Sequence, residues 1–394
     1  MSFSKTAFVY SDQFLQYSFH ENHPFNQKRI LLTKDLLYTH DALSEDDIIE
    51  PDTISPTILE LVHTKEYINV IKQASELSEI DNPEKYGIGT ADTPAFKGMF
   101  HAAMSLVEGT IKACELVANH DVIHALNLGG GLHHGFPDRA AGFCIFNDIA
   151  IGIKYLQQNY NFKILYIDTD AHHGDGVQHL FYNDSNVCTV SFHETGRYLY
   201  PGTGKVNERG IKEGFGYSFN FPLDAFTEDD SYLDTFHQGM DEICEFFRPD
   251  IIISQHGVDS HFLDPLTHMH CTCRIFEEIP KKIHQLAHQY CQGKWVALGG
   301  GGYDIWRVVP RAWAQLWQIL NNNEPFTGSI NQEWHRLWQS KAPCPLPDSW
   351  SDPVSQYKSI PRRKEITDYN NEILEQVLKF TKIAKKSDSD GVKP

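Results

Sequence analysis

The chain of 394 residues is long enough to bury a substantial core, as one large α/β domain or as two smaller ones. Its 41% hydrophobic and 22% charged residues are typical of a globular protein, which excludes intrinsic disorder for most of the chain. Asp and Glu outnumber Lys and Arg by 52 to 34, and the formal charge of −18 argues against nucleic acid as a ligand and favours cationic partners such as lysine-rich peptides or polyamines.

Short β-branched runs and amphipathic helical patterns alternate along the chain. The runs predict buried strands, and apolar residues at intervals of three and four predict helices between them. This alternation predicts an α/β fold with a mostly parallel central sheet and helices on both faces. The predicted strands lie at 6–10, 122–128, 163–168, 187–192, 250–254 and 294–298, and the clearest helices at 98–120, 147–160 and 231–247.

The chain shows no internal repeat and no Ser/Gly-rich linker, so we predict a single catalytic domain over 1–345. A C-terminal helical extension over 346–385, with its helix near 364–385, is expected to pack on that domain. The final residues 386–394 are polar and are expected to form a disordered tail.

The cysteines and the N-terminal segment bear on the compartment. The eight cysteines include no Cys-x-x-Cys pair, and the start "MSFSKTAFVYSDQF" lacks the apolar run of a signal peptide. No window reaches the ~18 apolar residues needed to span a bilayer. We therefore expect a cytoplasmic protein without a membrane segment.

Polar residues follow five of the predicted strands. Because ligands bind outside the carboxyl ends of the strands in an open parallel sheet, these residues are expected to meet at one edge. The motifs are "ALNLGGGLHHG" with His133 and His134, "YIDTDAHHGDG" at 166–176, "VSFHETG" with Ser191 and His193, "IISQHGVDSHFLDP" with Asp259, and "VALGGGGYD" with Tyr303.

Residues two apart in an extended chain share a face, so Asp168, Asp170 and His172 can point the same way as their strand ends. Carboxylate oxygen and imidazole nitrogen suit zinc or a similar divalent ion, and Asp259 would add a distant ligand. The alternative is a structural ion-pair network or a helix cap.

The adjacent His133 and His134 follow a triple glycine and could act as general base and acid, although packed or solvent-facing histidines are the ordinary alternative.

The segment "LGGGGYD" lacks the lysine and the hydroxyl residue of a phosphate loop, and its glycines instead let Tyr303 point inward. The segment "THMHCTC" has its histidines and cysteines too close together for a structural zinc motif, so we interpret it as a loop.

Together, "GGGLHHG…GFCIFND", "YIDTDAHHGDGVQ", "SFHETGRYLYPGTG", "QHGVDS" and "LGGGGY" resemble the metal-dependent histone deacetylase superfamily in order and spacing, over about residues 5–320. The segment "FVYSDQFLQYSFHENHPFNQKRI" is most similar to the bacterial acetoin-utilization branch of protein deacetylases. The resemblance implies a single arginase/deacetylase-like domain.

The resemblance also implies a set of site residues. It makes Asp170, His172 and Asp259 the ligands of zinc, with iron as the alternative metal, and makes Asp168 and Asp175 the partners of His133 and His134. A potassium ion would bind Asp168, Asp170 and Ser191 through side chains, and His172 and Phe192 through backbone carbonyls. Phe143 and Tyr200 would sandwich the acyl-lysine stem, Asp92 and the Gly142 carbonyl would hold substrate amides, and Leu266 would line the wall.

Two departures from the nuclear enzymes concern substrate preference: His256 stands where many carry cysteine, and Tyr200 replaces a common phenylalanine. The implied reaction is hydrolysis of acetyl-lysine, with His134 as the main base and acid and Tyr303 as the oxyanion donor. An acetylated protein is the expected substrate, and an acyl-CoA synthetase is an expected partner by analogy.

Three alternatives remain open. An acetylpolyamine amidohydrolase would share the metal centre but restrict the entrance. An arginase-type ureohydrolase would need two manganese ions, for which Asp264 could supply a further carboxylate. An acetyl-lysine binding module would usually have lost a ligand or the tyrosine.

Overall fold

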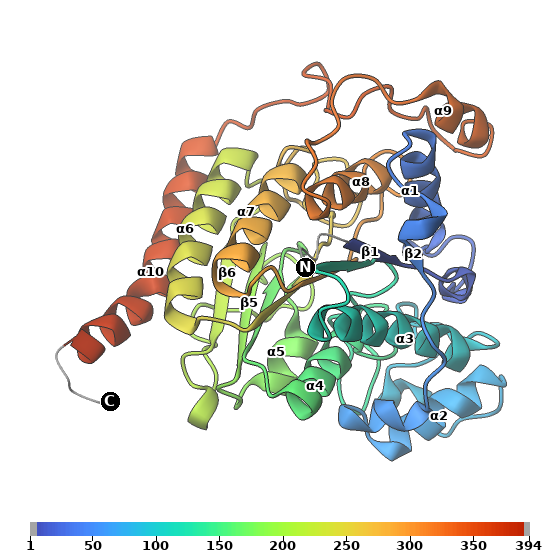
Figure 1. The fold of residues 1–394 in the computed structure, drawn as a ribbon, viewed down its shortest axis with the longest axis horizontal. Coiled ribbons are helices and arrows are strands. Elements are labelled where there is room, and N and C mark those ends of the chain that lie inside the picture. Colours follow the sequence, from blue (N-terminus) through green and yellow to red (C-terminus); the bar gives the residue numbers. More distant parts are fainter. Residues whose placement is uncertain (1–5, 390–394) are drawn as a thin grey trace.

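The computed structural model describes residues 6–389, and one eight-stranded sheet forms its centre (Figure 1). Every strand pairing is parallel, and the strand order is β2-β1-β3-β8-β7-β4-β5-β6. All carboxyl ends therefore meet at one edge. The strands are β1 (Thr6–Val9), β2 (Ile48–Ile49), β3 (His124–Asn127), β4 (Ile164–Asp168), β5 (Val187–Glu194), β6 (Ser218–Leu223), β7 (Ile251–Gln255) and β8 (Trp295–Leu298).

Two groups of helices cover the sheet on opposite sides (Figure 1). On one side α3 packs on α4 and on α2; on the other, α1, α8, α7, α6 and α10 contact one another in that order. The helices are α1 (Lys28–Thr39), α2 (Lys65–Ser75), α3 (Met99–Ala118), α4 (Asp148–Tyr160), α5 (Asp175–Phe181), α6 (Asp229–Phe247), α7 (Ile275–Tyr290), α8 (Val309–Leu320), α9 (Gln332–Trp338) and α10 (Arg363–Ser389).

This architecture confirms the predicted α/β fold with helices on both faces of the sheet. The six predicted strands are present, and the three predicted helices correspond to α3, α4 and α6. The sequence did not reveal β2, which is two residues long, or β6, which contains Asn220 and Pro222. A proline normally argues against a central strand, and β6 accommodates Pro222 because it is the edge strand.

The segment after residue 345 returns to the sheet and the helices that cover it. Helix α10 packs on α6 and β6, and the buried Asn370 donates to Thr227 and Ser231 in the loop before α6 and its first turn. The helix includes the first four residues of the predicted tail, 386–389; the remaining 390–394 lie outside the described residues. The apolar side chains of α10 buried in this contact are Ile366, Ile373, Leu374, Val377 and Leu378.

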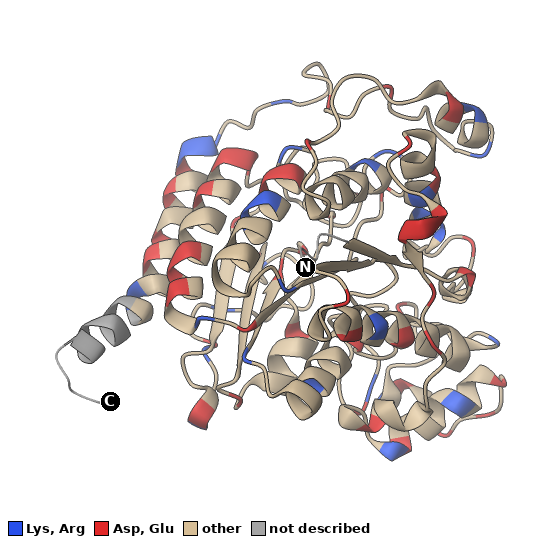
Figure 2. Cartoon of the chain, viewed as in Figure 1, with Lys and Arg blue, Asp and Glu red and all other residues tan. Residues whose placement is uncertain are grey.

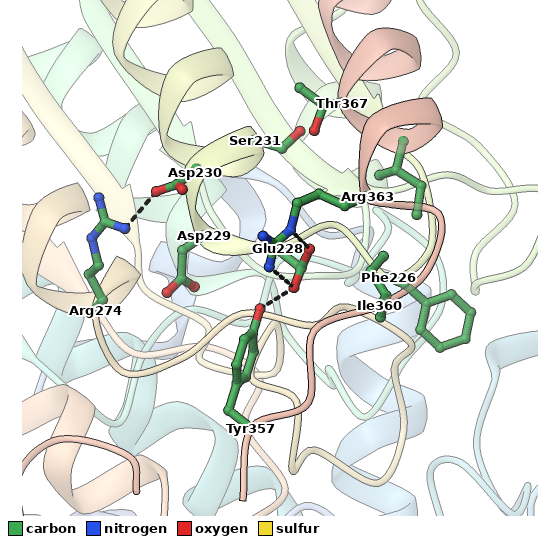
Figure 3. Close-up of a pocket in the computed structure, with 11 residues that line it drawn as sticks. Phe226, Glu228, Asp229, Asp230, Ser231, Arg274, Tyr357, Ile360, Arg363 and Thr367 are labelled. Carbon is green, nitrogen blue, oxygen red and sulfur yellow. Dashed lines mark hydrogen bonds and ion pairs between the residues drawn. The ribbon is translucent and has the colours of Figure 1, made fainter. Parts of the chain in front are cut away.

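A cluster of polar and charged side chains joins the beginning of α10 to the residue before α6 (Figure 3). Glu228, which is 6% exposed, accepts two hydrogen bonds from Arg363, at 2.6 Å to Nε and 2.9 Å to Nη2. The hydroxyl of Tyr357 donates to the same carboxylate at 2.5 Å. These charge-assisted bonds hold the connection into α10 against the start of α6.

We expect Arg363→Ala to lower the free energy of unfolding by about 1 kcal/mol, because the pair is bidentate but the Arg363 side chain is 58% exposed and therefore screened. Urea unfolding of Arg363→Ala, Glu228→Gln and the double variant measures the coupling. Additive effects of the two single changes would show that the pair contributes nothing.

Acidic residues are prominent along α6 and α10 (Figure 2). This distribution follows the excess of 52 acidic over 34 basic residues. Among the helices of residues 6–389, none combines the length and the apolar character that crossing a bilayer requires.

Candidate active site

Two carboxylates and one imidazole converge at the carboxyl ends of β4 and β7. Asp170 and His172 follow β4, and Asp259 lies four residues after β7. Nδ1 of His172 lies 3.1 Å from Oδ1 of Asp170 and 2.9 Å from Oδ2 of Asp259. One donor atom from each residue lies within 4.8 Å of the others, and all three side chains are buried. This donor set and spacing fit a divalent metal ion with three protein ligands.

Backbone and side-chain donors fix the orientation of both carboxylates. Oδ2 of Asp170 accepts from Nε2 of Gln255 at 2.7 Å and from the Gly301 amide at 2.6 Å, while the Ala171 amide donates to Oδ1 of Asp259 at 2.8 Å. A Cβ at Gly301 would lie 2.3 Å from Asp259 and 2.7 Å from Asp170. The glycine run after β8 is therefore needed to let the backbone approach these acids.

The two buried carboxylates Asp170 and Asp259 would be stabilised by a positive charge between them. Burial and the Asp170 charge raise the pKa of Asp259 to about 7. Burial alone would lower the pKa of His172, but Asp170 and Asp259 outweigh it and raise that pKa. A metal cation would supply the same compensation as a proton on this imidazole.

Two histidine–carboxylate pairs lie beside the three donors. Nδ1 of His133 is 2.8 Å from Oδ2 of Asp168, and Nδ1 of His134 is 2.6 Å from Oδ1 of Asp175. The two imidazole centroids are 3.9 Å apart, and that of His134 lies 6.1 Å from that of His172. Each Nδ1 is thus engaged by a carboxylate, which leaves the Nε2 atoms for chemistry.

The two imidazoles differ in charge. Burial would lower the pKa of His133, but Asp168 and Asp170 outweigh it and raise that pKa to about 9. Burial and the neighbouring His133 lower the pKa of His134. At neutral pH this arrangement favours a protonated His133 beside a neutral His134, which is the form a general base requires.

A third histidine supports the loop that carries this pair. His63 contacts the Phe136 carbonyl through Nδ1 and accepts from the Asn147 amide through Nε2, both at 3.0 Å. The side chain of Asn147 donates in turn to the Gly135 carbonyl at 2.9 Å. The neutral imidazole therefore satisfies the Phe136 carbonyl and the Asn147 amide, at the two ends of the loop that follows His134, a role that the sequence did not suggest.

We expect His63 to make the fold acid-sensitive, because burial lowers its pKa from 6.5 to about 4. Between those pH values the unfolded chain binds a proton that the folded chain does not, so stability is complete above pH 6.5 and falls by roughly 3 kcal/mol as the pH approaches 4. Unfolding of wild type, His63→Gln and the exposed control His101→Gln by urea at several pH values tests this. Equal slopes for the first two proteins would contradict it.

Aromatic rings surround the approach to these groups. The Phe143 ring lies 5.9 Å from Tyr303, the Tyr200 ring lies 5.2 Å from His134, and the Tyr303 ring lies 6.3 Å from His172. Gly142 has a φ of +48°, and a Cβ there would lie 2.3 Å from the His134 ring. Its carbonyl accepts from Sγ of Cys144 at 3.2 Å. The predicted wall residues are therefore assembled around the histidines.

The predicted rim residue Asp92 and the predicted wall residue Leu266 are more exposed than the histidines. Asp92 is exposed, and its carbonyl is 3.2 Å from Nε2 of His23. Leu266 is 37% exposed, and its amide donates to Asp264. Both are accessible to a large substrate.

Of the residues predicted for a monovalent cation, Asp168, Ser191 and Phe192 lie on the adjacent strands β4 and β5, and Asp170 and His172 follow β4. Asp168 pairs with Ser191 across β4 and β5. Oγ of Ser191 lies 2.9 Å from Nδ1 of His193, and the Phe192 carbonyl accepts from the Tyr232 hydroxyl at 3.4 Å.

The sequence analysis gave some residues of the site no role, and it gave Asp264 a different role from the one that the structure shows. Arg29, from α1, is 1% exposed and donates from Nη1 to the Gly302 carbonyl at 3.1 Å, directly before Tyr303. Asp264, considered above only as a ligand for a second metal ion, accepts from the Tyr303 amide at 2.8 Å. The Tyr166 hydroxyl donates to Asp168 at 2.6 Å. The contacts of Arg29 and Asp264 join residues distant in the sequence, so no local motif marks them, whereas Tyr166 lies two residues before its partner Asp168.

Comparison with known proteins agrees with this geometry. Residues 23–320 match the histone deacetylase domain. The chain belongs to the histone deacetylase family. Acetoin utilization protein AcuC of Bacillus subtilis (strain 168) is 54% identical over 374 residues, covering 95% of this chain and 96% of that protein. AcuC of Staphylococcus xylosus is 46% identical over 377 residues, covering 95% and 98%.

Solved structures of histone deacetylase homologues share the fold. A homologue from Aquifex aeolicus gives a TM-score of 0.83 at 29% identity over 94% of this chain and all of that one. A homologue solved in complex with SAHA gives 0.82 at 28% identity with the same coverage. This chain is therefore a hydrolase of the histone deacetylase family, similar to the AcuC proteins and carrying a candidate metal site.

Proposed function

We propose that this protein is a zinc-dependent lysine deacetylase of the acetoin-utilization type, which hydrolyses the acetyl amide of acetyl-lysine in proteins. The observation that carries the proposal is the convergence of a three-donor metal site with two histidine–carboxylate pairs and Tyr303 at one edge of the sheet. The AcuC relatives support the choice of branch.

The proposed metal ligands are Asp170, His172 and Asp259, for Zn²⁺ with Fe²⁺ as the alternative. Bound zinc would polarise the acetyl carbonyl and lower the pKa of the attacking water. Asp168 and Ser191 through their side chains, and Phe192 through its carbonyl, are the proposed contacts of a potassium ion.

The chain's own residues would move the protons. His134 accepts a proton from the attacking water at Nε2, while Asp175 holds its Nδ1 and stabilises the imidazolium that forms. His134 then delivers this proton to the lysine amine as it leaves. His133, held by Asp168, contributes positive charge. The Tyr303 phenol, whose pKa is raised by burial and by Asp170, remains protonated and donates to the developing oxyanion.

The substrate stem would lie between Phe143 and Tyr200, because an aromatic slot suits four methylenes that end in an uncharged amide. The Gly142 carbonyl would accept from the substrate amide. The exposed Asp92 would bind substrate backbone amides at the rim, and Leu266 would form an apolar wall. The net charge of −18 favours a lysine-rich protein surface as partner.

Acetylated enzymes such as an acyl-CoA synthetase are the proposed protein substrates. The eight free cysteines support work in a reducing cytoplasm. An acetylated polyamine is the second candidate, because it carries the same amide and the opposite charge to the protein.

Acetate release from an acetyl-lysine peptide and from an acetylated polyamine, measured side by side, tests the proposal. We expect peptide turnover that is lost on chelation, on His172→Ala and in Tyr303→Phe. Turnover of the polyamine alone would assign the protein to the amidohydrolase branch. Turnover of neither, with two ions that both require Asp259, would favour an arginase-type site.

A further inference from the structure

Three histidines gather at the opposite end of the sheet from the candidate active site. His124 is the first residue of β3, whose other end leads to His133 and His134. His284 and His288 are four residues apart on α7 and therefore share one face of that helix. His124 also pairs in the sheet with Trp295, the first residue of β8. The three histidines thus lie at the amino-terminal edge of the sheet.

Their ring nitrogens are spaced as metal ligands are. One nitrogen from each residue lies within 4.8 Å of the other two, and the Nε2 atoms of His284 and His288 are 3.2 Å apart. A tetrahedral zinc ion about 2.05 Å from each nitrogen sets neighbouring ligand atoms about 3.3 Å apart. The α7 pair already has this separation, and the His124 nitrogen lies within 4.8 Å of both.

The solvent exposure of the three histidines increases from β3 to the outer face of α7. His124 is 3% exposed, His284 is half-buried and His288 is exposed, so the cluster opens to solvent on the α7 side. Nδ1 of His124 is buried with no hydrogen-bond partner in residues 6–389. A buried polar nitrogen without a partner requires an explanation, and coordination of a metal ion would supply one.

The imidazoles are suited to binding a cation. Burial, together with His284 and His288, lowers the pKa of His124 to about 3, and burial with His288 lowers that of His284 to about 4. Both rings are therefore neutral at pH 7, the form that ligates metals.

We propose that His124, His284 and His288 form a second metal site, which binds a divalent transition-metal ion of the zinc, nickel and copper group through three imidazole nitrogens. A fourth position, on the exposed α7 side, is left for water. The ligand set contains no carboxylate, which distinguishes it chemically from Asp170, His172 and Asp259. An ion bound there links α7 directly to β3.

Zinc stoichiometry of the full-length protein tests this site. After removal of metal and dialysis against Zn²⁺, we expect about two zinc ions per chain in wild type and about one in His284→Ala/His288→Ala. The control His101→Ala removes an exposed histidine on α3 and should retain both ions. The α7 positions are chosen because His124 is buried in the sheet and its replacement could disturb folding.

The variant His172→Ala distinguishes the two proposed sites. It should lose the ion bound by Asp170, His172 and Asp259 and keep the ion bound by the histidines of α7 and β3. Equal zinc content in wild type and His284→Ala/His288→Ala overturns the second site, whatever His172→Ala shows. It would leave the three rings as an aromatic cluster in which the Nε2 atoms of His284 and His288 are joined by a hydrogen bond. Loss of zinc from the α7 variant with turnover intact supports the site independently of the proposed catalysis.

A copper-loaded sample provides a spectroscopic readout. In His172→Ala, bound Cu²⁺ should show electron spin echo modulations from several imidazoles, and these should vanish in His172→Ala/His284→Ala/His288→Ala. The Trp295 ring, 5.6 Å from that of His124, should also be quenched by Cu²⁺ only when the α7 histidines are present. Copper signals unchanged by the α7 substitutions overturn the proposal.

Discussion

His134→Ala is expected to lower the kcat for an acetyl-lysine peptide by about 10²–10⁴-fold, the usual contribution of a positioned general base and acid. His134 is suited to this role because its Nδ1 is held by Asp175 at 2.6 Å and because burial and His133 lower its pKa below 6.5. The imidazole is therefore neutral when the attacking water must lose its proton. The acid limb of kcat/KM against pH should accordingly lie below pH 6.5.

His133→Ala serves as the matched comparison, since this neighbour is equally buried and also bonded to a carboxylate. Its raised pKa makes it a source of positive charge, so its loss should reduce kcat less than the loss of His134. Single-turnover rates of both variants, at equal metal content, give the comparison. A greater loss in His133→Ala would exchange the two roles.

The grouping of polar residues at the strand ends was predictable from the side-chain alternation of a strand and from the parallel arrangement of the sheet. Alternation along a strand predicted one face for Asp168, Asp170 and His172, although β4 ends at Asp168 and the other two lie in the turn that follows. The parallel sheet brings the carboxyl ends of its strands together. The structure brings Asp170, His172 and Asp259 together and places the Tyr303 ring 6.3 Å from that of His172, while the roles assigned to these residues stay predictions.

The contacts and the strand that could not be predicted from the sequence depend on packing between distant segments. Arg29 lies on a helix near the N-terminus, yet it contacts the backbone of the loop before Tyr303. Gln255 and Asp264 belong to recognisable motifs, but their partners, Asp170 and the Tyr303 amide, are fixed only by the fold. β6 was missed because Pro222 is tolerated only at a sheet edge, and edge position is a property of the whole topology.

Tyr303→Phe is expected to lower kcat and kcat/KM for the same peptide equally, by about 10²–10³-fold, because the phenol donates to charge that develops only in the transition state. The substitution keeps the ring that packs 5.9 Å from Phe143 and 6.3 Å from His172, so substrate binding and metal content should be retained. The change thus removes one hydroxyl from an otherwise intact site.

Tyr200→Phe is the control for Tyr303→Phe, since it removes a hydroxyl from the other tyrosine of the proposed substrate slot. Tyr200 is 45% exposed, and its proposed role uses the ring face, so its phenylalanine variant should keep kcat within about twofold. Steady-state kinetics and zinc analysis of both variants separate an oxyanion donor from a packing residue. If Tyr303→Phe kept most of the wild-type kcat, the oxyanion would have to be stabilised without this phenol, and the proposed reaction would lose the residue that distinguishes it from a ureohydrolase.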